Sequence, residues 1–435
     1  MQSTPFIAIG GGALFAALLV AIVVQPHMIA VVLPVLGLYC FLGLRPELRR
    51  WPFSWRPVWV LPSVFAFYVA LTALWAADRR AAFVAGTLFA LYLICTRLAF
   101  VGIMNAETSV IERLGKYFVA AVAAGTVLLA VTIYSQGALH KAICAVFPAL
   151  APSDRDFVHF DGTTLEFVGL PYFNRNVALL NLLLWPALLV LARRVVDLRT
   201  AIAPIVLFLL VAVTTFGSEH QTSMVALAAS SFIYLVYRLS PRTAHILIVA
   251  GWIGAVVLVR PAVMFAYDHD LHKASWMQES ARARIILWNY TARQMAKAPI
   301  LGVGAQTTRA ESESGRHNEI LPGHAFPQWT GQHGHNIYIQ TWYELGLVGA
   351  ALLLGIGLLI LSWLRQIARP SQDFAGTTFV CASVMCASSF GMWQAWFIAL
   401  CMMVVVMVAL AVRWFDCQVP SRSATEPALV PQSAT

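Results

Sequence analysis

The sequence predicts an all-α integral membrane protein with about 12 transmembrane helices. Hydrophobic residues make up 60% of the chain and charged residues only 11%, well below the roughly 25% of soluble domains. Apolar runs long enough to span a bilayer recur along most of the chain. Basic residues are unevenly distributed between the segments that join these runs. The first two observations predict the fold class, and the third predicts its orientation.

The apolar runs fall into two groups, which one long polar segment separates. We place twelve spans near residues 5–24, 27–44, 58–76, 81–103, 117–134, 174–192, 201–216, 222–238, 244–267, 336–363, 374–392 and 393–413. The last two runs meet in a tight turn and the two at 201–238 are short, so counts of eleven or ten also fit.

This pattern divides the chain into four parts. Residues 1–267 carry the first nine spans and, at about 135–173, a smaller external loop. Residues 268–335 form a large external loop with candidate catalytic elements, and residues 336–413 form the last three spans. Residues 414–435 are rich in Pro, Ser, Ala and Thr, which is typical of a disordered tail.

Positive charges predict the orientation of the spans. If the N-terminus is cytoplasmic, cytoplasmic segments hold fifteen Lys or Arg side chains and the short external turns hold only Arg79 and Arg80. This asymmetry follows the positive-inside rule, and an even number of spans places both termini in the cytoplasm. The net charge of +9 is therefore mainly an orientation signal rather than a nucleic-acid-binding surface. Arg79 and Arg80 break the bias, so we expect them to have another role.

The large external loop contains six of the eleven histidines of the chain, and polar loops of this length tend to be functional. Residues 279–297 contain no Pro or Gly. Their apolar side chains fall on one helical face, at Ile285, Trp288, Ala292 and Met295. This pattern predicts an amphipathic helix on the outer membrane surface, covering a cavity between spans. Pro299, Gly302 and Gly304 then predict a tight turn.

His335 is the first candidate for chemistry, as a general base. Asn336 is a suitable N-cap for the following span, so His335 lies just outside a helix N-terminus. The partial positive charge there favours neutral imidazole, which is the form that a general base needs. The alternative is a surface histidine bonded to loop backbone. His333 and His335 could also bind a metal with His317 or His324, but this spacing is loose for zinc, so we expect no metal.

Arginines are the candidates for binding a diphosphate, because the guanidinium fork matches phosphate oxygens and stays charged. Arg282 and Arg284 lie on the predicted external helix, where snorkelling toward lipid headgroups is the alternative. The others lie at external span entrances: Arg79, Arg80 and Arg175.

Glu219 and His220 interrupt two apolar runs within Ser218-Glu-His-Gln-Thr-Ser223. Ionisable groups at membrane depth are expensive and are usually functional. We therefore include both residues among the candidates for substrate binding, with a solvated turn as the alternative.

Four short motifs follow one another between residues 284 and 349. They are Arg284-Ile-Ile-Leu-Trp288, Pro299-Ile-Leu-Gly302-Val-Gly304, His333-Gly-His335-Asn336-Ile-Tyr and Glu344-Leu-Gly346-Leu-Val-Gly349. Their order and spacing resemble the O-antigen ligase and polymerase superfamily of bacterial inner membranes. The resemblance is closest to the ligases, because the loop between spans is large and ends in His333-Gly-His335-Asn336. Phe173-Asn-Arg-Asn176 is also similar to the entrance motif of the family. The chain departs at Ser218-Glu-His220, where many members carry Ser-Arg.

The resemblance implies a GT-C-like membrane glycosyltransferase that works without a metal or another cofactor. It would transfer a finished polysaccharide from undecaprenyl diphosphate, the donor, to a sugar hydroxyl of lipid A-core, the acceptor, with inversion. The external loops would then be periplasmic. His335 would act as the base, and Arg284 would stabilise the departing diphosphate. The expected substrate-binding residues are Arg80, Arg175, Arg282, Asn336, His333, Glu219, His220 and Arg79.

Three other activities compete with ligation. An O-antigen polymerase would use the same donor and a lipid-linked glycan as acceptor, and a protein O-glycosylating enzyme would use a peptide. A transporter or flippase of a lipid-linked glycan would need charges along the full depth of the membrane. Here Arg97 is the main candidate for a charge deep in a span.

Overall fold

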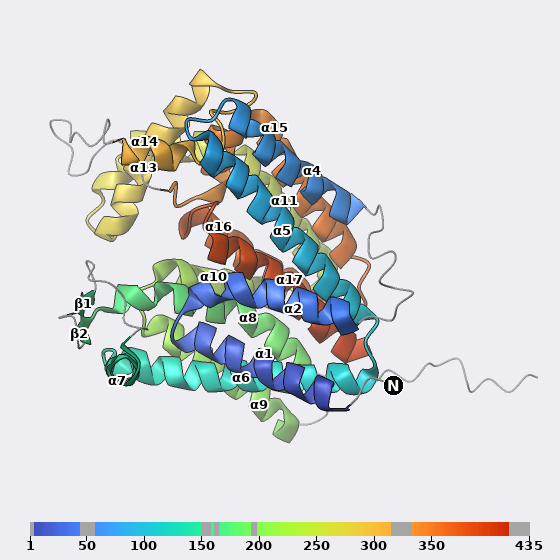
Figure 1. The fold of residues 1–435 in the computed structure, drawn as a ribbon. Coiled ribbons are helices and arrows are strands. Elements are labelled where there is room, and N and C mark those ends of the chain that lie inside the picture. Colours follow the sequence, from blue (N-terminus) through green and yellow to red (C-terminus); the bar gives the residue numbers. More distant parts are fainter. Residues whose placement is uncertain are drawn as a thin grey trace, which may run out of the picture.

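The computed structural model describes residues 4–43, 57–148, 158–160, 165–192, 198–314 and 333–416, and most of them are helical (Figure 1). The long helices are α1 (Thr4–Val23), α2 (Ile29–Gly43), α4 (Pro57–Leu71), α5 (Arg79–Met104), α6 (Thr108–Tyr134), α8 (Asn174–Ala192), α9 (Leu198–Phe216), α10 (Gln221–Leu239), α11 (Pro241–Val257), α13 (Glu279–Gln294), α15 (Ile337–Leu364), α16 (Ser371–Ser388) and α17 (Ala395–Asp416). The shorter elements are α7 (Ala138–Val146), α12 (Val259–Asp268), α14 (Thr307–Glu313), β1 (Val158–Phe160), β2 (Leu165–Val168), and the 3-10 turns η1 (Pro26–Met28), η2 (Thr72–Leu74), η4 (Leu170–Phe173), η5 (Leu271–Lys273) and η6 (Met295–Lys297).

The predicted all-α membrane fold is confirmed in its class. Among the described residues, seven helices are long and apolar enough to cross a membrane. They are Pro57–Leu74, Arg79–Met104, Thr108–Tyr134, Leu170–Ala192, Gln221–Leu239, Ile337–Leu364 and Ala395–Asp416. Each of the twelve predicted runs coincides with helix, but several of these helices are short, so the count of twelve spans stays a prediction.

One predicted span, 244–267, is broken in the structure. Its two halves, α11 and α12, meet at Leu258 with a bend of 70°. Only the two helices together are long and apolar enough to cross a membrane. Pro261 explains the break, because its ring has no N–H for the carbonyl of Val257 and clashes with it. The apolar run is therefore two helices, and α12 leaves the direction of α11 at the bend.

The segment predicted as the smaller loop, about 135–173, contains strand structure that the all-helical prediction missed. β1 and β2 pair antiparallel, with Val158 opposite Val168. Val158, Leu165 and Val168 are buried, so the hairpin packs its apolar side chains against the bundle. A run this short between polar residues has no clear periodicity in the sequence.

α8 and α17 form the centre of the bundle. In the most apolar 18-residue stretch of each helix, 83% of the residues are buried for Leu170–Ala192, which contains α8, and 72% for α17. α8 packs against α6, α9, α16 and α17, and a helix that is apolar all round belongs in such a position. Asn181 in α8 links two helices of this core, because its side-chain nitrogen donates to Thr215 Oγ1 of α9 at 2.8 Å.

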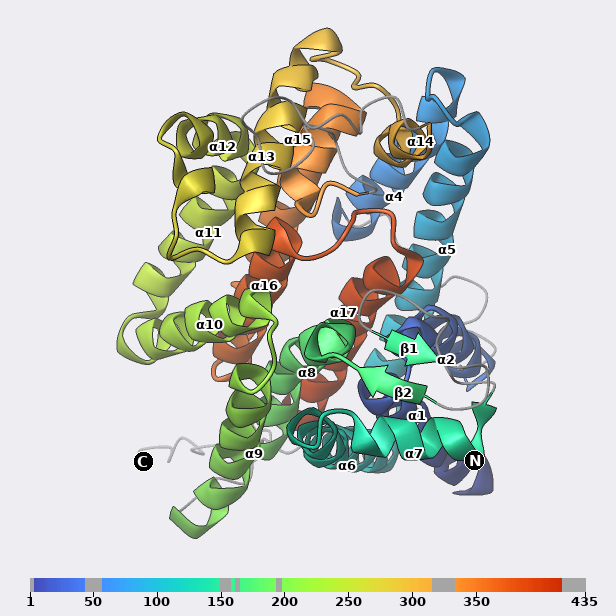
Figure 2. The ribbon, with the colours of Figure 1, turned by 90° about the vertical axis from the view of Figure 1, so that its left-hand side faces the viewer.

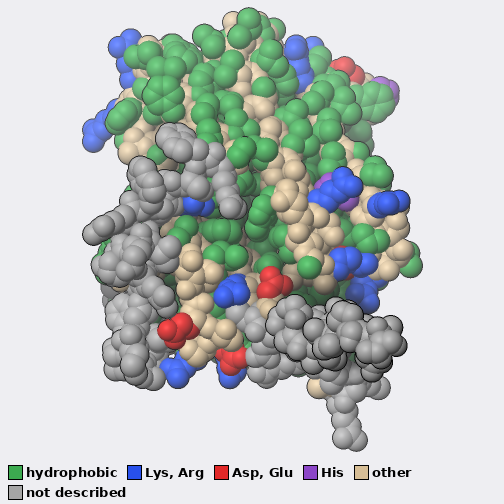
Figure 3. All heavy atoms as spheres, turned by 90° about the vertical axis from the view of Figure 1, so that its right-hand side faces the viewer, with side chains coloured by type: hydrophobic (Ala, Val, Ile, Leu, Met, Phe, Trp, Pro, Cys, Tyr) green, Lys and Arg blue, Asp and Glu red, His purple; other side chains and the backbone are tan. Residues whose placement is uncertain are grey.

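The two ends of the bundle differ in character. α7, the β hairpin, α13 and α14 lie together at one end (Figures 1 and 2). α15 and α17 begin near this end, and they finish at the other with Arg365 and Arg413. Figure 3 looks at that second end, over which Lys and Arg side chains are spread.

Candidate active site

The amphipathic helix predicted at 279–297 is present as α13 with η6. Ile285, Ala292 and Met295 are buried and Trp288 is half-buried, so the predicted apolar face is confirmed. This face packs against α12 and α15 rather than lying free on a surface. Figure 2 shows α13 lying beside α15.

The C-terminus of α16 is the point where the candidate residues meet. Arg284 Nη1 donates to the carbonyl oxygen of Ser388 at 2.7 Å. His335 Nδ1 lies 3.1 Å from the carbonyl oxygen of Ser389. The last carbonyls of a helix have no partner within it and carry partial negative charge. Here the guanidinium of Arg284 and the imidazole N–H of His335 supply the hydrogen bonds that these carbonyls lack.

The contact with Ser389 determines which nitrogen of His335 is available. A carbonyl oxygen only accepts hydrogen bonds, so Nδ1 carries the proton and donates. In the neutral ring, Nε2 then holds the lone pair. The backbone of His335 is left-handed, with φ of 50°, and Trp288 Nε1 donates to the carbonyl of Gly334 at 2.8 Å. These contacts hold the imidazole in one orientation.

The helix that follows His335 begins as predicted. Asn336 is the N-cap of α15, and its side-chain oxygen accepts from the backbone nitrogen of Ile339 at 3.0 Å. The ring of His333 lies beside that of His335, with 4.1 Å between centroids. Burial, His333 and Arg284, in that order, lower the pKa of His335 to about 3. His335 is therefore neutral at ordinary pH, as a general base must be.

His220 joins this cluster from the start of α10. Its Nε2 lies 2.9 Å from Ser389 Oγ and its Nδ1 lies 2.6 Å from Ser223 Oγ. Burial, followed by the charge of Arg284, lowers the pKa of His220 to about 3. His220, in the turn between α9 and α10, is thus buried and makes polar contacts through both ring nitrogens. The neighbouring Glu219 is exposed, and its proposed role stays a prediction.

Arg175 reaches the cluster from the first turn of α8. Burial lowers the pKa of His333 to about 4, and the charges of Arg175 and Arg284 add to the shift. His333 therefore lies within the field of both arginines. Arg282, two residues before Arg284, is half-buried, and its Nε has no hydrogen-bond partner among the described residues. Its part in substrate binding stays a prediction.

Arg79 and Arg80 lie apart from the histidines. Both are exposed in the first turn of α5. The segment before them packs against the turn at 302–307, where the backbone nitrogen of Ala77 lies 3.4 Å from Thr307 Oγ1. Within the described residues no contact joins either arginine to His333 or His335, so their part in substrate binding stays a prediction.

Two of the sequence motifs bind one another through their backbones. The nitrogens of Val303 and Gly304 donate to the carbonyls of Tyr343 and Glu344 at 3.1 and 2.8 Å. Leu347 N donates to Pro299 O at 2.9 Å. These bonds are available because α15 is kinked at Gly346, where φ is 63° and the regular helical ladder is interrupted.

The glycines in these two motifs are required by close approach. Gly302 and Gly304 have φ of 72° and 98°, which confirms the predicted turn. A Cβ on Gly302 would lie 2.3 Å from the carbonyl oxygen of Glu344, and one on Gly346 would lie 2.4 Å from that of Ile300. Only glycine combines this backbone conformation with this spacing.

The carboxylate of Glu344 anchors the same turn. The side chain is fully buried, and it accepts from the backbone nitrogens of Gln306 at 2.9 Å and Thr308 at 3.2 Å. Gln340 Nε2 donates to it at 3.1 Å, and Trp393 Nε1 donates to its second oxygen. A charge inside an apolar run was a signal that sequence analysis could have used.

Ser388 and Ser389 were also missed. Small polar residues at the end of an apolar run carry no distinctive signal, and the last residue of a helix is rarely located from sequence alone. Their importance appears only when α13, α10 and α15 come together around them.

Metal binding by the histidines has no support in the described residues. Among them, no group of three or more His, Cys, Asp or Glu side chains could hold a metal ion. The alternative ligands His317 and His324 lie outside the described residues.

Fold and site together define a multi-pass helical membrane protein with histidines and arginines clustered at one end of its bundle. Residues 206–354, which are less than half of the chain, match the family model described as O-Antigen ligase. The resemblance drawn from the motifs is thereby confirmed. The matched range contains all four motifs of residues 284–349, whereas Phe173–Asn176 lies outside it.

Curated relatives from Rickettsia are similar over a little more than half of this chain. A protein of Rickettsia typhi named "Putative polysaccharide ligase" is 26% identical over 256 residues, which are 56% of this chain and 60% of the relative. One of the same name from Rickettsia conorii is 25% identical over 249 residues, 55% of this chain and 58% of the relative. The chain thus aligns with less than two thirds of either relative.

Proposed function

We propose that this protein is a glycosyltransferase of the O-antigen ligase type. It would transfer a polysaccharide from undecaprenyl diphosphate to a sugar hydroxyl of lipid A-core. The observation that carries the proposal is that Arg284 and His335 bind adjacent carbonyls, those of Ser388 and Ser389. A fixed base beside a fixed cation matches the needs of this transfer. The match of residues 206–354 to the O-Antigen ligase model and the name of the relatives support a polysaccharide as substrate.

His335 is the proposed proton acceptor. The acceptor hydroxyl oxygen attacks the anomeric carbon while the bond from that carbon to the diphosphate oxygen breaks. The hydroxyl proton passes to Nε2 of His335, and undecaprenyl diphosphate leaves with the bonding electron pair. A single displacement of this kind inverts the anomeric centre. Positioned general bases contribute about 10²–10⁴-fold to such steps.

The charge of the diphosphate would tune this base. Arg284 and the burial of the ring hold the pKa of His335 far below its usual range. A diphosphate bound beside Arg284 brings negative charge into the cluster and raises that pKa. His335 would therefore gain basicity when the donor binds. Arg175, whose charge also lowers the pKa of His333 after burial, would share in binding the diphosphate.

We place the histidine-bearing end of the bundle at the periplasmic face of the bacterial inner membrane, with both termini in the cytoplasm. Arg365 and Arg413 close α15 and α17 at the other end, as the positive-inside rule favours for a cytoplasmic face. Single cysteines in a cysteine-free background test this orientation. Trp276→Cys, at a side chain that is 78% exposed, should react with an impermeant maleimide in cells whose outer membrane is permeabilised. Lys116→Cys should react only after lysis, and the reverse order would contradict the orientation.

The transfer itself can be tested with purified protein, undecaprenyl-diphosphate glycan and lipid A-core in EDTA. We expect transfer by the wild type and a loss of about 10²–10⁴-fold in His335→Ala. His269→Ala is the matched control, because His269 is exposed and bonds only locally, to the carbonyl of Phe265 at 2.9 Å. That variant should retain wild-type activity.

Two results would contradict the proposal. Full activity of His335→Ala would remove this residue from catalysis. Growth of the lipid-linked glycan without transfer to lipid A-core would show that the protein is a polymerase.

A further inference from the structure

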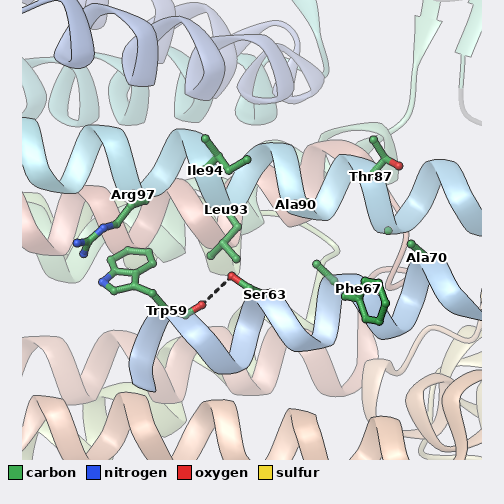
Figure 4. A pocket seen from close by; sticks show the side chains of 11 residues that line it. Trp59, Ser63, Phe67, Ala70, Thr87, Ala90, Leu93, Ile94 and Arg97 are labelled. Atoms are coloured by element: carbon green, nitrogen blue, oxygen red, sulfur yellow. Dashed lines mark hydrogen bonds between the residues drawn. The ribbon is translucent and has the colours of Figure 1, made fainter. Parts of the chain in front are cut away.

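A groove lies between α4 and α5 (Figure 4). Its volume is about 360 Å³. The walls are mostly apolar, and Phe67 and Ile94, which line it, are 69% and 43% exposed. Large apolar side chains exposed on a membrane-spanning helix face lipid, so this groove opens toward the bilayer.

The groove results from the way in which the two helices cross. At one end Gly86 meets Ala70, and a Cβ on Gly86 would lie 2.5 Å from the backbone nitrogen of Ala70. At the other end large side chains stand between the helices, where Trp59 packs edge-on against Phe100. The helices thus touch at one end and are held apart at the other. An elongated space follows from this difference in side-chain size.

A cation lies at the wide end of the groove. The guanidinium carbon of Arg97 is 4.7 Å from the centroid of the Trp59 ring, and only 9% of the Arg97 residue surface is exposed. A buried arginine in a membrane span is costly, and such residues are usually functional. The proposed transfer does not use Arg97.

The depth of Arg97 separates it from the proposed donor site. It follows Arg79 by 18 positions along α5, which is about 27 Å in an α-helix. The turn that contains Gly304 packs on Ala76, near the start of α5, so this start lies at the histidine-bearing end. Arg97 therefore lies toward the opposite membrane face. From Trp59 to Ala70, the groove runs about 16 Å along α4, close to the half-thickness of a hydrocarbon core, about 15 Å.

We propose that this groove binds one glycerophospholipid of the membrane leaflet opposite the histidine cluster. Its anionic phosphate binds Arg97 beside Trp59, and an acyl chain lies along the apolar walls toward Gly86. The positive charge of Arg97 favours an anionic phosphate, and the length of the groove fits an acyl chain of a lipid from one leaflet. The undecaprenyl donor does not fit this position, because its diphosphate belongs at the other membrane face. This site is independent of the proposed transfer reaction.

Photo-crosslinking tests the proposal directly. The purified protein is labelled in nanodiscs with phosphatidylglycerol that carries a diazirine in its acyl chain, and crosslinked peptides are mapped by mass spectrometry. We expect crosslinks on peptides of α4 and α5. Arg97→Gln should label about tenfold less, which is the loss expected for one charge-assisted hydrogen bond. Ala90→Phe, which fills the groove, should also lose the crosslink.

Lys116→Gln is the matched control, because it removes an exposed cation near the same membrane face and should label like the wild type. Thermal melting of each variant verifies that it is folded. Equal labelling of folded Arg97→Gln and wild type would overturn the proposal. Equal labelling by a diazirine diacylglycerol, which lacks the phosphate, would do the same. Displacement by undecaprenyl phosphate, but not by excess phosphatidylglycerol, would instead assign the groove to a polyprenyl lipid.

Discussion

Arg284 in α13 binds the carbonyl oxygen of Ser388 at 2.7 Å, and so joins α13 to the end of α16 across 104 positions of sequence. Burial is the main cause of the low pKa of His335 and of His220, and the charge of the same guanidinium adds to both shifts. One side chain thus contacts the cluster and contributes to its electrostatic potential.

Replacing Arg284 should therefore impair transfer more than replacing its neighbours. We expect Arg284→Ala to reduce the rate by about 10²–10³-fold, as the loss of a group that stabilises developing charge does. Arg284→Lys should recover only part of this loss, because an ammonium cannot form the guanidinium fork. The measurement is the initial rate of transfer to lipid A-core.

Arg293→Ala is the matched control for that comparison. Arg293 lies on the same helix, where it is exposed and pairs with Asp268 at 3.3 Å. Its replacement should leave the rate unchanged. Equal losses in the Arg284 and Arg293 variants would indicate general damage to α13 and would contradict a specific role.

The low histidine pKa values predict that acid destabilises the protein. In the folded chain the pKa of His220 is about 3, whereas an unperturbed histidine has a pKa of about 6.5. Below about pH 6.5 the unfolded state binds a proton at this histidine that the folded state does not bind. The contribution of His220 to the free energy of unfolding is therefore complete above about pH 6.5 and falls as the pH decreases toward 3. At pH 5 the loss for this residue is up to about 2 kcal/mol.

The melting temperature in detergent at pH 7 and pH 5 measures this effect. His220→Gln should melt lower than the wild type at pH 7, because it disrupts the contacts with Ser223 and Ser389. It should then lose less stability between pH 7 and pH 5. A drop as large as that of the wild type would show that other groups cause the acid sensitivity.

The kink of α15 predicts a strict requirement for glycine. Gly346→Ala would place its Cβ 2.4 Å from Ile300 O at a φ of 63°, so we expect a loss of about 1–3 kcal/mol from backbone strain alone. Gly251→Ala is the matched control, because a Cβ there meets nothing within 4 Å and the residue lies inside helix α11. This control should melt at or above the wild-type temperature. If the two variants melt alike, the kink does not depend on glycine.

Much of the fold could be predicted because local patterns determine it. The apolar runs predicted the helices, the absence of Pro and Gly predicted α13, and Asn336 predicted the start of α15. The break before Pro261 was missed because a long apolar run was taken as a single span, although the proline itself is the physical cause.

The site could be predicted only in part, because its geometry depends on tertiary contacts. His335, Arg284 and His220 were recognised as chemically suited, and the structure brings them together around Ser389 and its neighbour. Arg80 has the same chemistry, yet it is exposed in the first turn of α5, and only the segment before it, at Ala77, contacts the 302–307 turn. Residue type and position along a span could not distinguish these two cases, since the distinction lies in how the helices pack.

Glu344 provides the sharpest test of how the motifs support the site. Its buried carboxylate accepts from four donors, two of them backbone nitrogens of the 306–308 turn. Glu344→Gln keeps the size of the side chain but replaces one accepting oxygen with an amide nitrogen. The N–H groups that donated to that oxygen then face an NH₂ group, which cannot accept a hydrogen bond. We expect a loss of about 2–4 kcal/mol, as for a buried network with one member removed. Glu313→Gln, at an exposed pair with Arg309, should leave the melting temperature unchanged. Since Trp393 and the 302–307 turn both depend on this carboxylate, transfer should fall together with stability in Glu344→Gln. A variant that melts like the wild type would show that the carboxylate charge is not what fastens the turn to α15.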